Sequence, residues 1–108
     1  MIHILSKEKF RMKHKIYNIS GAYYARLGQL DAAVKSYKKV IAIKPDSAEA
    51  HYNLGATLQR LGQLDAAVKS YKKVIAINPN SAEAHYNLGA TLQRLGQLFT
   101  SFTSCFTS

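Results

Sequence analysis

The sequence predicts an all-α solenoid of antiparallel helix hairpins, and an internal repeat is the main reason. Residues 26–64 recur at 60–98, an offset of 34 positions. The copies differ only in that Lys44 and Asp46 are replaced by Asn78 and Asn80. Each copy carries apolar residues at helical spacing, with glycine or proline between the helical segments. A fixed period of this length is typical of helical-hairpin arrays, whose function lies in a surface that the stacked repeats build.

The first helix of the repeat is expected near residues 48–61. Its packing stripe consists of His51, Leu54, Gly55 and Leu58. This i, i+3, i+4, i+7 spacing places the four residues on one helical face. Asp46, with Glu49 three residues later, has the spacing of an N-terminal capping box. Gly62 is expected to end the helix, because glycine readily adopts the left-handed conformation.

The second helix is expected near residues 65–78. Its apolar stripe consists of Leu64, Ala67, Val68, Tyr71, Val74 and Ile75. Pro79 is expected to end this helix, as Pro45 does one repeat earlier. Two such helices form a hairpin, and each hairpin leaves an apolar face uncovered until the next hairpin packs on it.

These residues resemble the tetratricopeptide repeat (TPR) family, whose pattern is Trp-x2-Leu-Gly-x2-Tyr, then Ala-x3-Phe, then Pro. The matching positions are His51, Leu54, Gly55, Leu58, Ala67, Tyr71 and Pro79 in the second unit, Tyr17, Ser20, Gly21, Tyr24, Ala33, Tyr37 and Pro45 in the first, and His85, Leu88, Gly89 and Leu92 in the third. The resemblance covers about residues 14–98 and implies a right-handed solenoid. His51, His85 and Ser20 replace larger apolar residues of the pattern, so somewhat weaker packing is expected.

The predicted division of the chain has five parts. They are a basic N-terminal lead-in at 1–13, TPR units at 14–47 and 48–81, the first helix of a truncated third unit at 82–98, and an irregular tail at 99–108. The tail consists of uncharged Phe-Thr-Ser triplets with β preference. It is either an accident of the gene, such as a frameshift or truncation, or a genuine flexible terminus. Without a second helix, Leu88, Leu92 and Leu95 would be left uncovered, which predicts self-association or fraying at this end.

The resemblance implies that the first helices line a concave groove that binds extended peptides. Asparagines at the places of Asn53 and Asn87 form a ladder in arrays of the O-GlcNAc transferase type, and an amide both donates and accepts hydrogen bonds. The predicted peptide-binding residues are Asn53, Asn87, Tyr52, Tyr86, Gln59, Gln93, Arg60 and Arg94. Ile19 interrupts the ladder in the first unit. The alternative is that these are solvated consensus residues without a common ligand. A clamp for a chaperone's terminal carboxylate is disfavoured, because only Asn53 fits its pattern.

The formal net charge of +9 favours acidic partners and suggests a second function, the binding of RNA or another polyanion. The basic residues concerned are Lys35, Lys38, Lys39, Lys69, Lys72 and Lys73 on the second helices, and Lys7, Lys9, Arg11, Lys13 and Lys15 near the N-terminus. No aromatic side chain is expected on the lysine faces to stack bases. Asp31 and Asp65 stand four residues before Lys35 and Lys69, so ion pairs are expected to explain part of the pattern.

The sequence contains no pattern that suggests an enzyme, a cofactor or a metal site. His51 and His85 are expected on different hairpins without further ligands, so a packing role is favoured over zinc binding. No apolar run is long enough to cross a membrane. The single cysteine, Cys105, allows no internal disulfide, so a cytoplasmic location is expected. The predicted function is therefore a scaffold or adaptor that binds a protein or peptide. A further alternative is a fragment of a larger TPR protein such as a glycosyltransferase.

Overall fold

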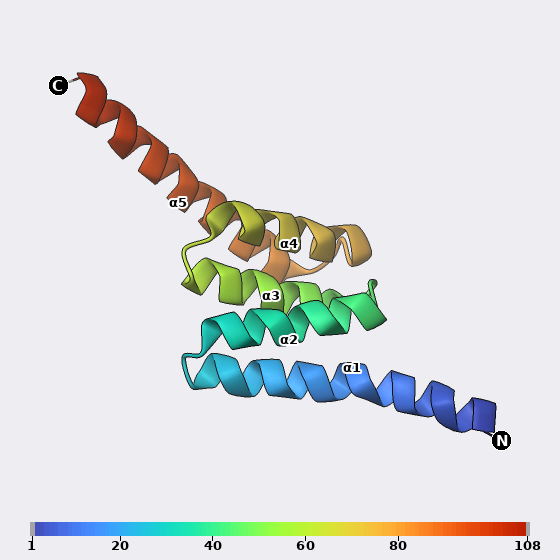
Figure 1. Ribbon diagram of the computed structural model, residues 1–108. Helices are drawn as coiled ribbons and strands as arrows, with labels where there is room; N and C mark the ends of the chain where they lie inside the picture. Colours follow the sequence, from blue (N-terminus) through green and yellow to red (C-terminus); the bar gives the residue numbers. More distant parts are fainter. Residues whose placement is uncertain (1, 108) are drawn as a thin grey trace.

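The computed structural model describes the backbone of residues 2–107 and the side chains of residues 12–98. The described backbone forms five α-helices and no strand: α1 (Ile2–Arg26), α2 (Leu30–Ile43), α3 (Ala48–Arg60), α4 (Leu64–Ile77) and α5 (Ala82–Thr107). Each helix packs mainly against its neighbours in the sequence, and α1 also contacts α3. The helices are stacked in chain order, with α1 and α5 at opposite ends (Figure 1). The predicted all-α solenoid is confirmed.

The turns within the hairpins are made by glycine in the left-handed conformation. Gly28 has φ of 79° and Gly62 has φ of 80°. After α3, the backbone N–H of Gln63 donates to the carbonyl of Leu58 at 2.9 Å, and that of Gly62 donates to Gln59 at 3.1 Å. These bonds satisfy carbonyl groups that the end of a helix leaves free. Gly62 therefore ends α3 in the way the sequence predicts.

The N-terminal cap of α3 is Ser47, so the prediction of Asp46 was wrong by one residue. The Ser47 hydroxyl accepts a hydrogen bond from the backbone N–H of Ala50 at 3.2 Å. The backbone N–H of Ser47 donates to the carbonyl of Lys44 at 3.1 Å and closes a turn. Because Pro45 and Asp46 are the central residues of that turn, Ser47 becomes the last residue before the helix.

A contact between glycine and tyrosine joins the two helices of each complete hairpin. A Cβ placed on Gly21 would lie 2.6 Å from Cε1 of Tyr37, and one placed on Gly55 would lie 2.9 Å from Cε1 of Tyr71. Both tyrosines are buried, together with Leu54 and other residues of one core cluster. The glycine of the repeat therefore allows an aromatic ring to pack directly against the backbone of the first helix.

The histidines at the usual tryptophan position have a role that the sequence did not reveal. His51 Nε2 donates to the carbonyl of Pro45 at 2.9 Å, and His85 Nε2 donates to the carbonyl of Pro79 at 2.8 Å. Each histidine therefore links a first helix to the turn that precedes it. His51 is also buried, as its packing role requires.

The C-terminal end of the chain differs from the prediction, because α5 is longer than expected. The lead-in at 1–13 contributes to α1 from Ile2 onward, and residues 99–107 continue α5. The prediction of an irregular tail was therefore wrong. Gly96 lies inside α5 without the positive φ of Gly62. Residues 97–108 contain no proline or glycine, and residues 99–102 are Phe-Thr-Ser-Phe where residues 65–68 are Asp-Ala-Ala-Val.

Candidate functional site

The site that the structure favours is a cleft between α1 and α3. Its volume is about 340 Å³, and its lining residues are Lys15, Asn18, Ile19, Ala22, Glu49 and Asn53. Pockets of this volume are at the lower end of those that hold small ligands or parts of peptides. The cleft contains Asn53, one of the two asparagines predicted to hold a peptide.

Two amide side chains in this cleft have unused hydrogen-bonding capacity. Oδ1 of Asn18 is buried and has no partner among the described residues. The side chain of Asn53 likewise makes no hydrogen bond within the described part of the chain. A buried acceptor without a partner costs about 1–3 kcal/mol. Because this oxygen is closed to solvent, a ligand can donate to it only after the Asn18 side chain turns toward the cleft.

The cleft exists because Asn18 stands where the next repeat has a tyrosine. Tyr52 lies 34 positions after Asn18, and its hydroxyl accepts a hydrogen bond from Nδ2 of Asn87 at 2.8 Å. The ring of Tyr52 also packs against that of Tyr71, with 5.9 Å between the centroids. Asn53 is the counterpart of Asn87, but Asn18 is too short to take the part of Tyr52. Tyr52 therefore joins α3 to α5, whereas Asn18, at the same position of the first repeat, leaves a space between α1 and α3.

Several other predicted site residues are used within the chain. Gln59 accepts a hydrogen bond from the hydroxyl of Tyr71 at 2.8 Å, and Arg60 donates to the carbonyl of Ala25 at 3.0 Å. Tyr86, Gln93 and Arg94 are exposed on α5. The structure thus brings Asn53 together with Asn18 and leaves the remaining predicted residues divided between internal contacts and solvent.

Burial raises the pKa of both tyrosines that pack on the glycines. The pKa of Tyr71 is raised to about 12, chiefly by desolvation and also by the nearby Tyr52. The pKa of Tyr37 is raised by desolvation and by the negative charge of Glu49, which lines the cleft. Both hydroxyl groups are therefore neutral in the folded chain near neutral pH, and Tyr71 donates to Gln59 in that form.

Comparison with known families then settles the kind of repeat. The family described as TPR repeat matches residues 21–62 and 60–96. The chain belongs to the tetratricopeptide repeat family. No curated protein matches the sequence. A TPR solenoid of this kind is a protein-binding scaffold, and this general function is the one that the family supports.

Solved structures of MamA are similar to this TPR chain. One has a TM-score of 0.76 and 27% identity, with 78% of this chain and 49% of that chain covered. A second has a TM-score of 0.75 and 32% identity, with 77% and 45% covered. A point mutant of MamA has a TM-score of 0.71 and 26% identity, with 77% and 61% covered. The chain therefore spans about half the length of these neighbours.

The second TPR helices present an exposed lysine surface, made of Lys35, Lys38, Lys39, Lys69, Lys72 and Lys73. Lys39 places Nζ 5.1 Å from the centre of the Tyr17 ring, a cation–π contact. The ion pairs predicted for Asp31 and Asp65 are not formed: between residues 12 and 98, neither aspartate pairs with a basic side chain. Both aspartates are exposed, so water competes with such pairs. Lys7, Lys9, Arg11 and Cys105 lie outside the residues whose side chains are described.

The described TPR residues contain no group of three or more histidine, cysteine, aspartate or glutamate side chains placed to hold a metal ion. Among the same residues, no helix combines the length and the hydropathy that crossing a membrane would require.

Proposed function

We propose that this TPR chain binds an extended segment of a partner protein in the cleft between α1 and α3. The observation that carries the proposal is the unpaired Oδ1 of Asn18 beside the unpaired amide of Asn53. An extended peptide offers a carbonyl that accepts from Asn53 and a backbone N–H that donates to Asn18 once this side chain turns toward the cleft. Such contacts give affinity without dependence on the peptide's side chains.

The charges and apolar side chains around the cleft favour a particular kind of peptide. Ile19 is exposed in the lining and offers an apolar contact. Lys15 attracts an acidic side chain, whereas Glu49, at the same position one repeat later, disfavours one. The net charge of +9 adds a general attraction for acidic segments. We therefore expect a ligand that has an apolar residue beside an acidic one.

The surface extends onto α5 in this proposal. Tyr86, Gln93 and Arg94 are exposed there and are available to the same ligand. Asn87 and Tyr52 already bond each other, so we expect their contribution to be smaller than that of Asn53. The proposed role is binding without catalysis or a cofactor, and the lone cysteine suits a cytoplasmic location. If the chain is part of a longer protein, as in arrays of the O-GlcNAc transferase type, the cleft serves that protein as its binding module.

The test is selection of ligands from a random dodecapeptide library on the immobilised chain, followed by affinity measurements on variants. Asn18→Tyr closes the cleft with the residue that the next repeat has at this place, so it is a matched variant. We expect Asn18→Tyr and Asn53→Ala to weaken the selected peptides at least about tenfold, or about 1.4 kcal/mol. Asn87→Ala is expected to have a smaller effect. Affinities unchanged by both Asn18→Tyr and Asn53→Ala would show that the cleft is not the site.

Binding of a polyanion is the second candidate, favoured by the six exposed lysines of α2 and α4 that lack ion pairs. A labelled 20-nucleotide RNA tests it. Binding through phosphate contacts is expected to fall steeply between about 50 and 200 mM salt. Weak binding that salt does not change would argue against this second function.

A further inference from the structure

The third copy of the first helix exposes a face that the second copy buries. Residues 48–64 and 82–98 have the same sequence, so differences in burial report what surrounds them. Leu58 of α3 is 5% exposed, whereas its counterpart Leu92 of α5 is 46% exposed. His85 and Gly89 are also exposed, although His51 and Gly55 are buried. We call the surface made by His85, Gly89 and Leu92 the open face of α5.

The opposite face of α5 is already covered, so the difference in burial between α3 and α5 is restricted to the open face. Ala84 and Thr91 are fully buried, and so, within 3%, are their counterparts Ala50 and Thr57 in α3. The helix against which α5 mainly packs is α4. In α3, by contrast, both faces are covered, since α2 and α4 both pack against it. The open face of α5 is thus the one that a helix of its own hairpin would occupy.

The chain itself shows twice which helix fits this face. The two helices that cover the equivalent faces, α2 and α4, have the identical sequence Leu-Asp-Ala-Ala-Val-Lys-Ser-Tyr-Lys-Lys-Val-Ile-Ala-Ile. Their tyrosines lie within 3 Å of where a Cβ would stand on Gly21 and Gly55. At Gly89 no atom of the residues with described side chains lies within 4 Å of that point. The position that an aromatic ring occupies in both complete hairpins is empty in α5.

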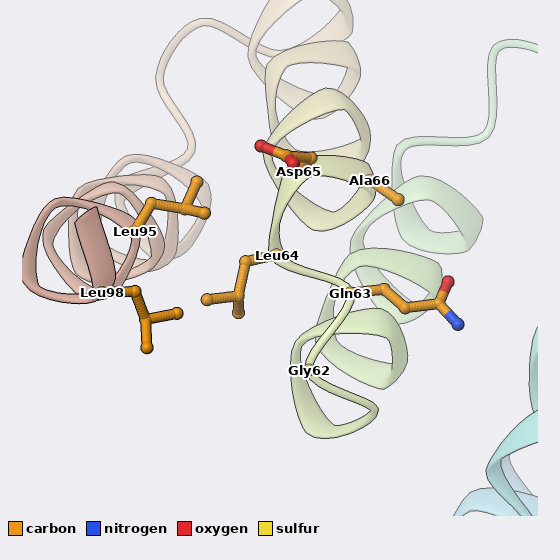
Figure 2. A pocket seen from close by; sticks show the side chains of 7 residues that line it. All are labelled: Gly62, Gln63, Leu64, Asp65, Ala66, Leu95 and Leu98. Carbon is orange, nitrogen blue, oxygen red and sulfur yellow. The ribbon is translucent and has the colours of Figure 1, made fainter. Parts of the chain in front are cut away.

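An apolar cleft of about 320 Å³ lies beside the open face and continues onto the N-terminal end of α4. Figure 2 shows Leu95 and Leu98 of α5 and Leu64 of α4 directed toward this space. Leu98 is 61% exposed, whereas its counterpart Leu64 is 4% exposed. A docked helix would therefore bury leucine side chains as well as the surface at Gly89.

We propose that the open face of α5 is a docking site for an amphipathic helix of another protein, with two adjacent alanines and a tyrosine four residues after the second alanine. The tyrosine packs on Gly89, and the apolar stripe of the helix covers Leu92. This is the pattern of Ala66, Ala67 and Tyr71 in α4. The site lies on a different face of α5 from Asn87, but Tyr86 and Gln93 border it, since their counterparts Tyr52 and Gln59 contact Tyr71 in the complete hairpin.

A second copy of this chain is a poorer occupant than a separate helix. The two helices that carry the required pattern are held by their own glycines within each copy. Packing of two α5 helices at Gly89 would place small surfaces against each other, where each complete hairpin has a tyrosine of its second helix. The net charge of +9 on each chain also opposes association between copies.

The test uses the full chain labelled with 15N and a synthetic peptide with the sequence of α4. We expect amide shifts that concentrate at residues 84–96. A peptide in which alanine replaces the tyrosine serves as the control, and its Kd is expected to be at least about tenfold higher. Because a helix of this length is marginal when isolated, a second peptide carries a hydrocarbon staple at the places of Lys69 and Lys73, which face solvent in α4.

Gly89→Leu is the matched variant of the chain. It fills the empty position, and the exposed helical glycine can be replaced without a clash. We expect it to raise the Kd of both peptides at least about tenfold. Absence of shifts with the stapled peptide, or a Kd that Gly89→Leu leaves unchanged, would overturn the proposal. So would sedimentation that shows a dimer of the chain converted to monomer by Gly89→Leu, because a second copy would then be the occupant.

Discussion

Replacing Gly55 and Gly89 by alanine, one at a time, separates helix propensity from packing. The two glycines have the same neighbours in the sequence and both lie inside helices. Alanine is favoured over glycine there by about 0.8–1 kcal/mol. At Gly89 no atom of residues 12–98 lies within 4 Å of the new Cβ, so the variant should gain this free energy of unfolding. At Gly55 the Cβ would lie 2.9 Å from Cε1 of Tyr71, which is fully buried and has no room to move.

Such overpacking costs about 1–3 kcal/mol. Gly55→Ala should therefore lie about 1–3 kcal/mol below Gly89→Ala in stability, and at or below the unmodified chain. Urea unfolding followed by circular dichroism at 222 nm measures both values. Gly21→Ala is the control, since its Cβ would lie 2.6 Å from Tyr37 and it should behave as Gly55→Ala does. Equal stabilisation by Gly55→Ala and Gly89→Ala would refute the packing of Tyr71 on Gly55.

Four further substitutions test the tyrosine and asparagine contacts. The raised pKa of Tyr71, about 12, means that the unfolded chain loses this proton first above pH 10. The contribution of the protonated Tyr71 hydroxyl to the free energy of unfolding is complete below pH 10 and is lost toward pH 12. Tyr71→Phe should therefore reduce the alkaline fall in stability by up to about 3 kcal/mol, measured by urea titrations at several pH values. Asn18→Tyr should raise the free energy of unfolding by about 1 kcal/mol, because the new hydroxyl can accept from Asn53 and the unpaired buried oxygen of Asn18 is removed. A lower Tm would contradict the view that position 18 is equivalent to Tyr52. Asn87→Ala should cost about 1 kcal/mol and Asn53→Ala less than about 0.5, since only Asn87 has a hydrogen bond to lose; equal Tm shifts would argue against this difference.

The sequence predicted the fold well because its signals are local and occur in register. Gly62 can take positive φ, Pro79 cannot continue a helix, and both occur at the expected places. The cap was misassigned for an equally local reason. Asp46 and Ser47 are both good capping residues, and only the turn closed by the Ser47 N–H to Lys44 determines which of them is next to the helix.

The site was harder to predict, because it depends on contacts between repeats. Arg60 bonds Ala25 and Asn87 bonds Tyr52, and both pairs are separated by 35 positions. Asn53 was predicted from its place in the ladder, but Asn18 was not predicted to line the same cleft. Comparison of the repeats could have pointed to Asn18, since it stands one period before Tyr52. What the comparison lacked was the knowledge that the Tyr52 side chain reaches the next first helix.

The same sequence forms a turn at Gly62 and an unbroken helix at Gly96, so the glycine permits the turn without enforcing it. What differs is the segment that follows. After Gly62, α4 packs back and buries Leu64 and Tyr71. Burial of each such side chain is worth about 1.5–3 kcal/mol, more than the backbone hydrogen bonds that the turn interrupts. After Gly96, Phe99, Phe102 and Phe106 continue the helical spacing of Leu95, so the apolar residues that follow favour an unbroken α5 over a turn.

This argument predicts the result of a graft. Replacing residues 99–108 by the sequence of residues 65–77 gives Gly96 the same continuation as Gly62. We expect Gly96 to take positive φ, Leu98 to become buried as Leu64 is, and the free energy of unfolding to rise. Because the new tyrosine would occupy the position at Gly89, binding of the α4 peptide should also be lost. A structure determined by NMR would decide the matter: an unbroken helix through Gly96 in the graft would mean that the turn at Gly62 depends on something other than the packing of α4.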